Sequence, residues 1–210
     1  MRNRFIELTA TPAVIAAREA NGSASAYAFS AEDEAVNNRL SEREAAFIGA
    51  RDSFYMATVS ATGWPYIQHR GGPAGFVKIL SESEFAFADF RGNRQFLSAG
   101  NAQTDERAAF FFMDYPNRRR LKLLGRLRFT DFKADPALAK ALALPGYRAL
   151  PERAVRVHVE AFDWNCPQHI APRFSERDIA ESMAPMRERL AELEAENQRL
   201  REKITQENSK

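Results

Sequence analysis

The sequence has little cysteine, little tryptophan and no long apolar run. A single cysteine, Cys166, excludes an intrachain disulfide and is compatible with a reducing cytosol. No run of about 18 apolar residues could span a bilayer, and charges interrupt each possible secretion signal at the N-terminus. We therefore expect a soluble, cytoplasmic protein without a membrane partner.

The common catalytic and metal-binding motifs are also missing. The histidines, His69, His158 and His169, lie on separate predicted elements without the spacing of a metal site. Cys166 lies three residues before His169, but it precedes a proline, and a structural pair is the simpler interpretation. The sequence contains no G-x-S-x-G, no G-K-[ST] phosphate loop and no G-x-G-x-x-G fingerprint, which argues against common hydrolases and nucleoside triphosphatases. We expect no metal.

Charge of one sign is not in excess either. The 30 basic and 28 acidic residues give a net charge of +2, too balanced to indicate nucleic acid binding. Basic residues do gather at 118–128, where a solvated strand face and a ligand-binding face both remain open. Phenylalanine is abundant, with 16 residues that fall mostly in strand-like runs. At 210 residues the chain can form one domain with a core and an appendage.

Apolar and polar residues alternate in a pattern that predicts a mainly β fold. Six to seven hairpin-linked strands with few helices indicate an antiparallel barrel. The expected strands are 53–60, 64–70, 76–80, 84–90, 107–115, 120–132 and 153–164. The expected helices are 12–20 after Thr11, 42–50 behind a capping box, 93–99 capped by Asn93, and 136–144.

The tail has a hydrophobic period of 3.5 residues. Position a of the heptad holds Met183, Leu190, Asn197 and Ile204, and position d holds Ile179, Met186, Leu193 and Leu200. Leucine at d with one interior asparagine at a favours a parallel two-stranded coiled coil. Pro185 is expected to break or begin the helix, so the secure coil is about 185–207. The alternative is a lone amphipathic helix that packs on its own domain.

Two glycine-basic segments suggest a site for an anionic, flat ligand. They are RGGPAG at 70–75 and RGNR at 91–94, set among the strand-like runs FVKIL, EFAFADF, AAFFFMDYP and RRLKLLGRLRF. Asn93 at a helix start, with Arg91 and Arg94 beside it, would form an anion seat. RGGPAG can also be a simple wide turn.

Two further residues could belong to the same site. Lys78 interrupts an apolar strand, which costs stability unless it points outward or pairs with an anion. Trp164 can cover a ring of the ligand or can be an ordinary core residue.

These pieces together resemble the pyridoxamine 5'-phosphate oxidase-like split-barrel family, in particular its predicted FMN-binding branch. The resemblance covers about 41–174. It is carried by FIGARDSFYMATVSATGWPYIQHRGGPAGFVKIL, EFAFADFRGNRQFLSAGN, DERAAFFFMDYPNRRRLKLLGRLRF and WNCPQHIAPRF. It implies a homodimer that binds FMN at the interface between two copies. The substrate-reading segment of the oxidases is not recognisable, and the coiled-coil tail is an addition.

The resemblance also implies a set of cofactor-binding residues. Ala88, Asp89 and Phe90 match the strand end that leads to FMN. Asn93 and Arg94 match the step that grips the phosphate, and Lys78 or Arg70 could replace a cation of the oxidases. Arg120 would reach the flavin from the other copy, and Trp164 resembles a late aromatic residue near the ring. No catalytic residue follows from the resemblance.

We therefore expect an FMN-dependent oxidoreductase that acts on a small molecule. The alternatives are a non-catalytic flavin-binding or redox-sensing protein, or a split barrel that binds deazaflavin or haem, with His69 or His169 as a haem ligand. The expected domains are an N-terminal helical or loop extension at 1–40, the FMN-binding split barrel at 41–174 and the coiled-coil helix at 175–210.

Overall fold

The computed structural model describes residues 1–30, 32–164 and 166–208. These residues form two compact units. The first unit contains Met1–Asp114 and Arg118–Ile170, and the second contains Tyr115–Asn117 and Ala171–Lys210. None of the helices in the described part of the chain is long and apolar enough to cross a membrane.

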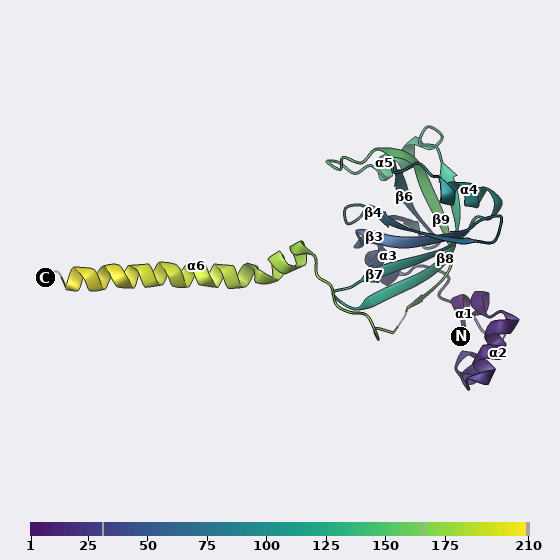
Figure 1. The fold of residues 1–210 in the computed structure, drawn as a ribbon, viewed down its shortest axis with the longest axis horizontal. Helices are drawn as coiled ribbons and strands as arrows, with labels where there is room; N and C mark the ends of the chain where they lie inside the picture. Colours follow the sequence, from purple (N-terminus) through teal and green to yellow (C-terminus); the bar gives the residue numbers. More distant parts are fainter. Residues whose placement is uncertain (31, 165, 209–210) are drawn as a thin grey trace. The chain divides into compact units, whose positions relative to one another are not determined.

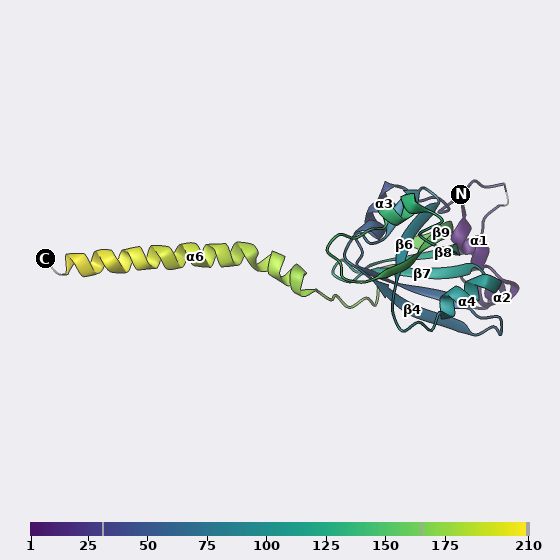
Figure 2. The same cartoon turned by 90° about the horizontal axis from the view of Figure 1, so that it is seen from above.

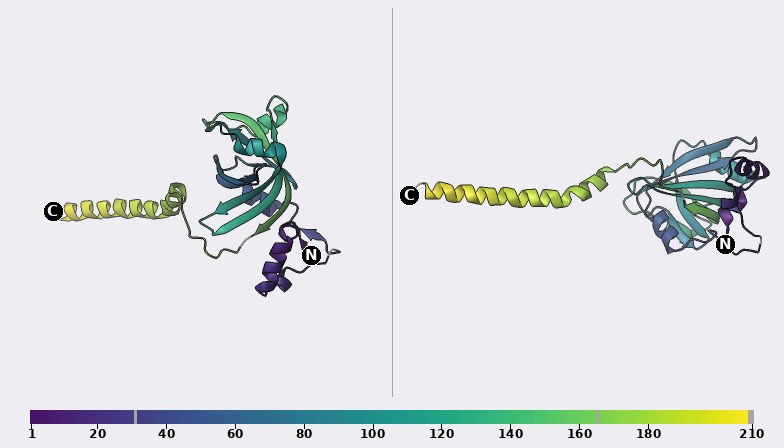
Figure 3. Two further views of the ribbon diagram at one scale, coloured as in Figure 1. Left: turned by 45° about the vertical axis from the view of Figure 1, so that its right-hand side comes forward. Right: turned by 90° about the horizontal axis from the view of Figure 1, so that it is seen from below.

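The first unit is built on one seven-stranded sheet with the order β4-β3-β7-β8-β9-β6-β5, and its strand pairs are antiparallel (Figure 1). Its strands are β3 (Ser53–Val59), β4 (Pro65–Gly71), β5 (Lys78–Ser81), β6 (Glu84–Phe90), β7 (Arg107–Asp114), β8 (Arg119–Thr130) and β9 (Pro151–Trp164). The sheet is strongly curved (Figure 3), and β4 and β5 form its two edges. The mainly β, antiparallel split-barrel prediction is therefore confirmed.

Phenylalanine fills the inside of the curved sheet. Alternate residues of each strand point inward, so that Phe54 and Met56 of β3 are buried while Tyr55 faces out. The rings of Phe54 and Phe87 meet edge to face at 5.0 Å, and the ring of Phe85 meets that of Phe110 at 5.4 Å. Such edge-to-face pairs add about 0.5–1.5 kcal/mol each beyond simple burial. The Phe-rich composition thus becomes one continuous aromatic core.

A smaller apolar cluster lies on the outside of β6 and β9. Helix α5 (Pro136–Ala141) is capped by Asp135, whose side chain accepts a hydrogen bond from Leu138 N at 2.9 Å. Leu138 and Leu142 then pack on small residues of the two strands, including Ala88. The side chain of Ala88 therefore faces α5 and not the inside of the barrel.

The predicted helix at 12–20 is confirmed as α2 (Pro12–Ala20), and the helix expected from Glu42 is α3 (Glu42–Gly49) with its capping box. Four short elements were not predicted: α1 (Arg4–Thr9), the 3₁₀ helix η1 (Ala24–Tyr27) and the parallel strands β1 (Arg2–Asn3) and β2 (Ala35–Val36). They contain too few residues to show a hydrophobic period. Helix α1 lies against β9, which fixes the N-terminal segment on the barrel.

The predicted helix at 93–99 is wrong in both position and cap. Helix α4 spans Leu97–Thr104, so Gly100 lies inside it. Arg94 and Phe96 have left-handed backbone angles, with φ of 59° and 54°, and this delays the start of the helix. The side chain of Asn93 accepts a hydrogen bond from Gln95 N at 3.2 Å, which makes a local turn and not a helix cap. In Figure 2, α4 and α3 lie on opposite sides of the barrel.

The second unit is dominated by α6 (Glu176–Glu207), which begins with a capping box between Ser175 and Asp178. The expectation that Pro185 breaks or begins this helix is wrong, because the helix continues on both sides of it. The capping box starts the helix well before Pro185, and proline costs only a local hydrogen bond and some steric strain there. In the same unit, the guanidinium of Arg173 lies 4.9 Å from the ring centroid of Tyr115.

Candidate anion site at the barrel mouth

A cavity of about 250 Å³ opens where β4, the end of β6, the start of β9 and the loop before α4 meet. We call it the mouth pocket. Its lining is mainly polar, with the side chains supplied by four separate segments. They are Tyr66, Gln68, His69, Arg70, Asp89, Phe90, Gly92, Asn93, Arg94, Gln95, Phe96, Leu97, Ser98, Ala99, Glu152 and Arg153.

One carboxylate holds two arginines in this pocket. Asp89 is only 5% exposed, and each of its oxygens accepts from a different guanidinium. Arg70 Nη1 donates to Oδ1 at 2.5 Å, and Arg153 Nε donates to Oδ2 at 2.8 Å. Asp89 and Arg153 are register partners on β6 and β9, so the sheet itself sets this contact. Two cations around one anion leave a net positive charge at the base of the pocket.

Arg70 also keeps unused hydrogen-bonding capacity. Its Nε is buried and has no hydrogen-bond partner within the described residues. A buried donor without a partner costs about 1–3 kcal/mol, so a ligand oxygen placed there would recover that energy. A third guanidinium lies at the same mouth, because the cation of Arg94 is 5.6 Å from the ring centroid of Phe96 and that of Arg153 is 5.0 Å from it. Arginine presents several N–H groups that match a phosphate or carboxylate group.

A small polar network supports the wall behind α4. Gln68 donates to the hydroxyl of Ser98, and Asn101 donates to the hydroxyl of Thr58 at 2.9 Å. Thr58 and Ser98 are themselves buried, and their oxygens lie 3.5 Å apart. These bonds attach the first turns of α4 to β3 and β4, and they fix the loop that carries Arg94.

Five residues proposed from the sequence lie together in the mouth pocket: Arg70, Asp89, Phe90, Asn93 and Arg94. Asp89 has a use that the sequence did not suggest, since both of its oxygens are engaged by arginines.

Two other proposed residues point elsewhere. Ala88 faces α5, and Lys78 pairs with Ala86 across β5 and β6, which places its side chain on that same outer face. Lys78 does not line the mouth pocket.

Arg120 and Trp164 do not line the mouth pocket. Trp164 ends β9, a strand of 14 residues whose first residues, Glu152 and Arg153, line the pocket. Arg120 is at the start of β8 and pairs with Met113. Its Nε is buried and, as far as the structure is described, has no hydrogen-bond partner. Within one chain neither residue lines the pocket.

Trp164 is part of a compact polar-aromatic cluster. Its Nε1 donates to Glu44 at 2.7 Å, and its ring meets Phe47 edge to face at 4.7 Å. The guanidiniums of Arg43 and Arg119 lie 4.5 and 5.0 Å from the Trp164 ring centroid. Burial alone would raise the pKa of Glu44, but hydrogen bonds from Ser41 and Trp164 outweigh it and hold the pKa below the ordinary value.

The sequence reasoning missed Arg153, Gln68 and Phe96. One signal could have pointed to Arg153, because an aspartate in the apolar run EFAFADF requires a cation nearby. Only the strand register decides that Arg153 is opposite Asp89. The segment RGGPAG acts mainly as a turn. An added Cβ at Gly72 would lie 2.8 Å from Phe76 Cγ, so this glycine allows Phe76 to pack closely.

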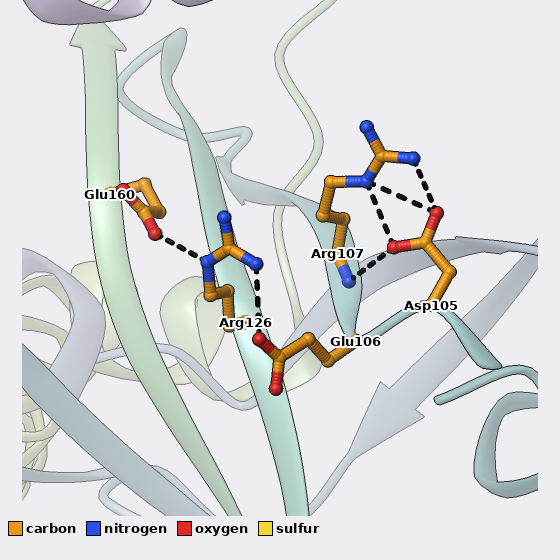
Figure 4. Close-up of polar contacts among 5 residues, drawn as sticks. All are labelled: Asp105, Glu106, Arg107, Arg126 and Glu160. Carbon is orange, nitrogen blue, oxygen red and sulfur yellow. Dashed lines mark hydrogen bonds and ion pairs between the residues drawn. The ribbon is translucent and has the colours of Figure 1, made fainter. Parts of the chain in front are cut away.

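A second feature is an apolar groove on the outer face of β3, β4, β7 and β8, with two adjoining hollows of about 550 and 490 Å³. Ile67 is 67% exposed there, and Tyr55 and Val59 are also exposed. Ion pairs border the groove (Figure 4): Arg107 with Asp105 at 2.6 Å, and Arg126 with Glu106 at 3.0 Å and Glu160 at 2.6 Å.

A hydrogen bond from Arg107 lowers the pKa of Asp105 to about 2, so that carboxyl is ionised at neutral pH. An apolar centre with a charged rim is the usual composition of a protein interface.

The fold and the site together define the class of this protein as a curved split barrel with arginines at its mouth. The model of the family described as pyridoxamine 5'-phosphate oxidase matches residues 40–163. The chain belongs to the pyridoxamine 5'-phosphate oxidase family. No curated protein matches the sequence of the chain.

Three solved structures are similar to this chain. A proposed pyridoxamine 5'-phosphate oxidase from Lactobacillus delbrueckii has 21% identity and a TM-score of 0.45, over 61% of this chain and 96% of its own. An FMN-binding protein from Syntrophomonas wolfei has 11% identity and a TM-score of 0.45, over 58% and 83%. The haem storage protein HutZ from Vibrio cholerae has 12% identity and a TM-score of 0.39, over 60% and 94%.

Proposed function

We propose that the chain binds FMN, with its phosphate in the mouth pocket. The observation that carries the proposal is the buried, unpartnered Nε of Arg70, beside Arg94 and Arg153. A phosphate at this point would accept from Arg70 and from the loop that holds Arg94. Charge-assisted hydrogen bonds of this kind are about twice as strong as neutral ones.

The charges at the pocket fit a dianion better than a neutral ligand. Arg70, Arg94 and Arg153 oppose Asp89 and Glu152, and Glu152 is already paired with Arg91 at 2.8 Å. Asp89 pairs with Arg70 and Arg153 and so partly neutralises both guanidiniums before the ligand arrives. The negative charge of the phosphate would then neutralise the positive charge that remains on the arginines.

The size of the pocket supports a site shared between two copies. Its 250 Å³ is below the ~300–1,000 Å³ of pockets that enclose a whole small ligand, so it suits the phosphate end and leaves the ring outside. In the homodimer that we propose, the outer apolar groove would meet a second copy. That copy would supply Arg120 and Trp164, which do not line the pocket within one chain.

Bound FMN would supply a hydride acceptor and donor at N5, which makes an oxidoreductase acting on a small molecule the reaction class we propose. The chain itself would bind and orient the ring. The guanidinium of Arg120 would supply positive charge near the ring, which would stabilise the negative charge that develops on reduction. A flavin binder without turnover uses the same residues, and substrate-driven bleaching of the flavin under anaerobic conditions separates the two.

The binding proposal is tested by titrating the purified protein with FMN and with riboflavin, which has the same ring and no phosphate. FMN should bind at least ~10-fold tighter than riboflavin, because charge-assisted phosphate contacts contribute about 1.5–3 kcal/mol each. Arg94→Ala should remove this preference, while Arg91→Ala, in the same loop but paired with Glu152 at the surface, should retain it. Equal affinity for the two flavins in the unaltered protein would contradict the proposed phosphate site.

Haem is a second candidate because His69 lines the mouth pocket. Haem requires an axial ligand, and imidazole is a common one. A strong haem absorbance band on titration, lost in His69→Ala and accompanied by no FMN binding, would favour this alternative. FMN binding that is unaffected by His69→Ala would exclude it.

A further inference from the structure

Helix α6 carries an uncovered apolar stripe. Seven large apolar side chains at heptad positions a and d are between 39% and 68% exposed. They are Ile179, Met183, Met186, Leu190, Leu193, Leu200 and Ile204. Their regular spacing along a helix of 32 residues forms a narrow seam, and the positions between them are mostly charged. A seam of this width fits another helix of the same kind better than a flat surface.

We propose that this seam binds the same helix of a second copy, side by side and in parallel, as a two-stranded coiled coil. The inference goes beyond flavin binding, because it uses only residues of α6. The helix that carries the seam runs from Glu176 to Glu207, or roughly 48 Å at ~1.5 Å per residue.

Asn197 selects the orientation of the two helices. It is the polar member of the seam, at an interior a position. In a parallel pair in register, Asn197 faces Asn197 of the second copy, and the two amides can hydrogen-bond to each other. In an antiparallel pair with full overlap, Asn197 would face Met186, which leaves a buried amide without a partner. The parallel arrangement therefore satisfies the polar group, and the antiparallel one does not.

The charges beside the seam agree with this register. In a parallel pair, Arg189 at position g lies opposite Glu194 of the second copy, and Glu196 lies opposite Arg201 of the second copy. Both contacts are attractive. Within one helix, Arg189 contacts Glu192 at 2.8 Å, an exposed pair that can exchange for the contact between chains at little cost.

The test uses the full-length protein with Cys166→Ser, so that a single new cysteine is present. Leu193→Cys places a thiol at position d, and Ala195→Cys, two residues away on the outer face, is the matched control. In a parallel coil in register, the Cβ atoms of the two 193 residues come within the ~3.5–4.5 Å that a disulfide requires. Mild oxidation should therefore give roughly tenfold more covalent dimer from Leu193→Cys than from Ala195→Cys.

A mixture of differently tagged Leu190→Cys and Leu193→Cys proteins distinguishes the orientation. In the fully overlapped antiparallel pair, residue 190 of one copy lies opposite residue 193 of the other. A disulfide between the two tagged variants would then form in the mixture, and Leu193→Cys alone would form no covalent dimer. That result would overturn the parallel arrangement. Equal cross-linking of Leu193→Cys and Ala195→Cys, or no cross-linking of either variant or of the mixture, would overturn the coiled coil itself. Neither result depends on flavin, so failure here is distinct from failure of the FMN proposal.

Discussion

Asp89 and Arg153 face each other across β6 and β9, and Arg153 Nε donates to the Asp89 carboxylate at 2.8 Å. The other oxygen of Asp89 accepts from Arg70, so a single buried carboxylate orders two of the three arginines at the barrel mouth. The family resemblance had suggested that Asp89 contacts the cofactor. Its hydrogen bonds indicate that it positions the residues that would do so.

Asp89→Asn is therefore expected to lower the stability of the ligand-free protein by about 1–3 kcal/mol, because two partly buried guanidiniums lose their counter-charge. FMN should then raise the melting temperature of the variant more than that of the unaltered protein, since phosphate replaces the missing charge. Thermal unfolding with and without FMN measures both effects. The control Glu152→Gln removes an ion pair whose arginine is half exposed, and it should cost under about 1 kcal/mol. Unchanged stability with loss of FMN binding would mean that Asp89 contacts the nucleotide itself.

A shared site predicts complementation between variants. Arg94→Ala and Arg120→Ala should each bind FMN poorly, because one damages the phosphate end and the other the ring end of every site. If two copies exchange freely in a two-fold dimer, half of the dimers in an equal mixture combine both variants, and each of these has one intact site. About a quarter of all sites should then bind FMN tightly in the co-expressed mixture. No recovery above the single variants would indicate that one chain forms the whole site.

Because the pKa of Glu44 is lowered in the folded protein, the free energy of unfolding should depend on pH. The pKa of Glu44 is lower in the folded protein than its ordinary value of 4.5, so the ionised carboxylate stabilises the folded state. This stabilisation is fully present above pH 4.5 and is lost as the pH falls through the lowered pKa. Glu44→Gln should cost about 1.5–3 kcal/mol near pH 7, from the loss of charge-assisted hydrogen bonds with Ser41 and Trp164.

Urea unfolding at several pH values should show this difference shrinking below pH 4.5. Glu42→Gln is the matched control, since Glu42 is exposed in the first turn of the same helix. A difference between Glu44→Gln and the unaltered protein that stays constant with pH would contradict the assigned role.

Alanine is expected to destabilise the protein at one glycine of the glycine-basic segments and to be tolerated at another. Gly72→Ala would bring a Cβ within 2.8 Å of Phe76 Cγ and 2.9 Å of Phe76 Cβ, and Phe76 is buried. Overpacking of this kind costs about 1–3 kcal/mol. Gly92→Ala meets no atom of the described chain within 4 Å, and it should change stability by less than about 0.5 kcal/mol. Chemical denaturation compares the two, and equal stability of both variants would show that the turn at Gly72 relaxes freely.

The alternation of apolar and polar residues along the sequence was enough to predict most of the strands and the antiparallel β fold. Phe54, Met56 and Phe87 alternate with outward residues because a strand exposes its two faces in turn, and this needs no tertiary information. The start of α4 could not be predicted, since the left-handed angles of Arg94 and Phe96 depend on packing at the mouth. The start of α6 was also wrongly predicted from Pro185, because a capping box ten residues earlier, at Ser175, decides where this helix begins.

By itself the sequence determined the periodicities, and with them a Phe-filled antiparallel sheet and an amphipathic tail. It also placed Arg70, Asp89 and Arg94 on segments that could meet. Tertiary structure alone decided that Asp89 faces Arg153 and that Ala88 and Lys78 point away. The physical reason is register: a shift of one residue in a strand pair exchanges its two faces, and the local pattern does not fix which distant strand lies opposite.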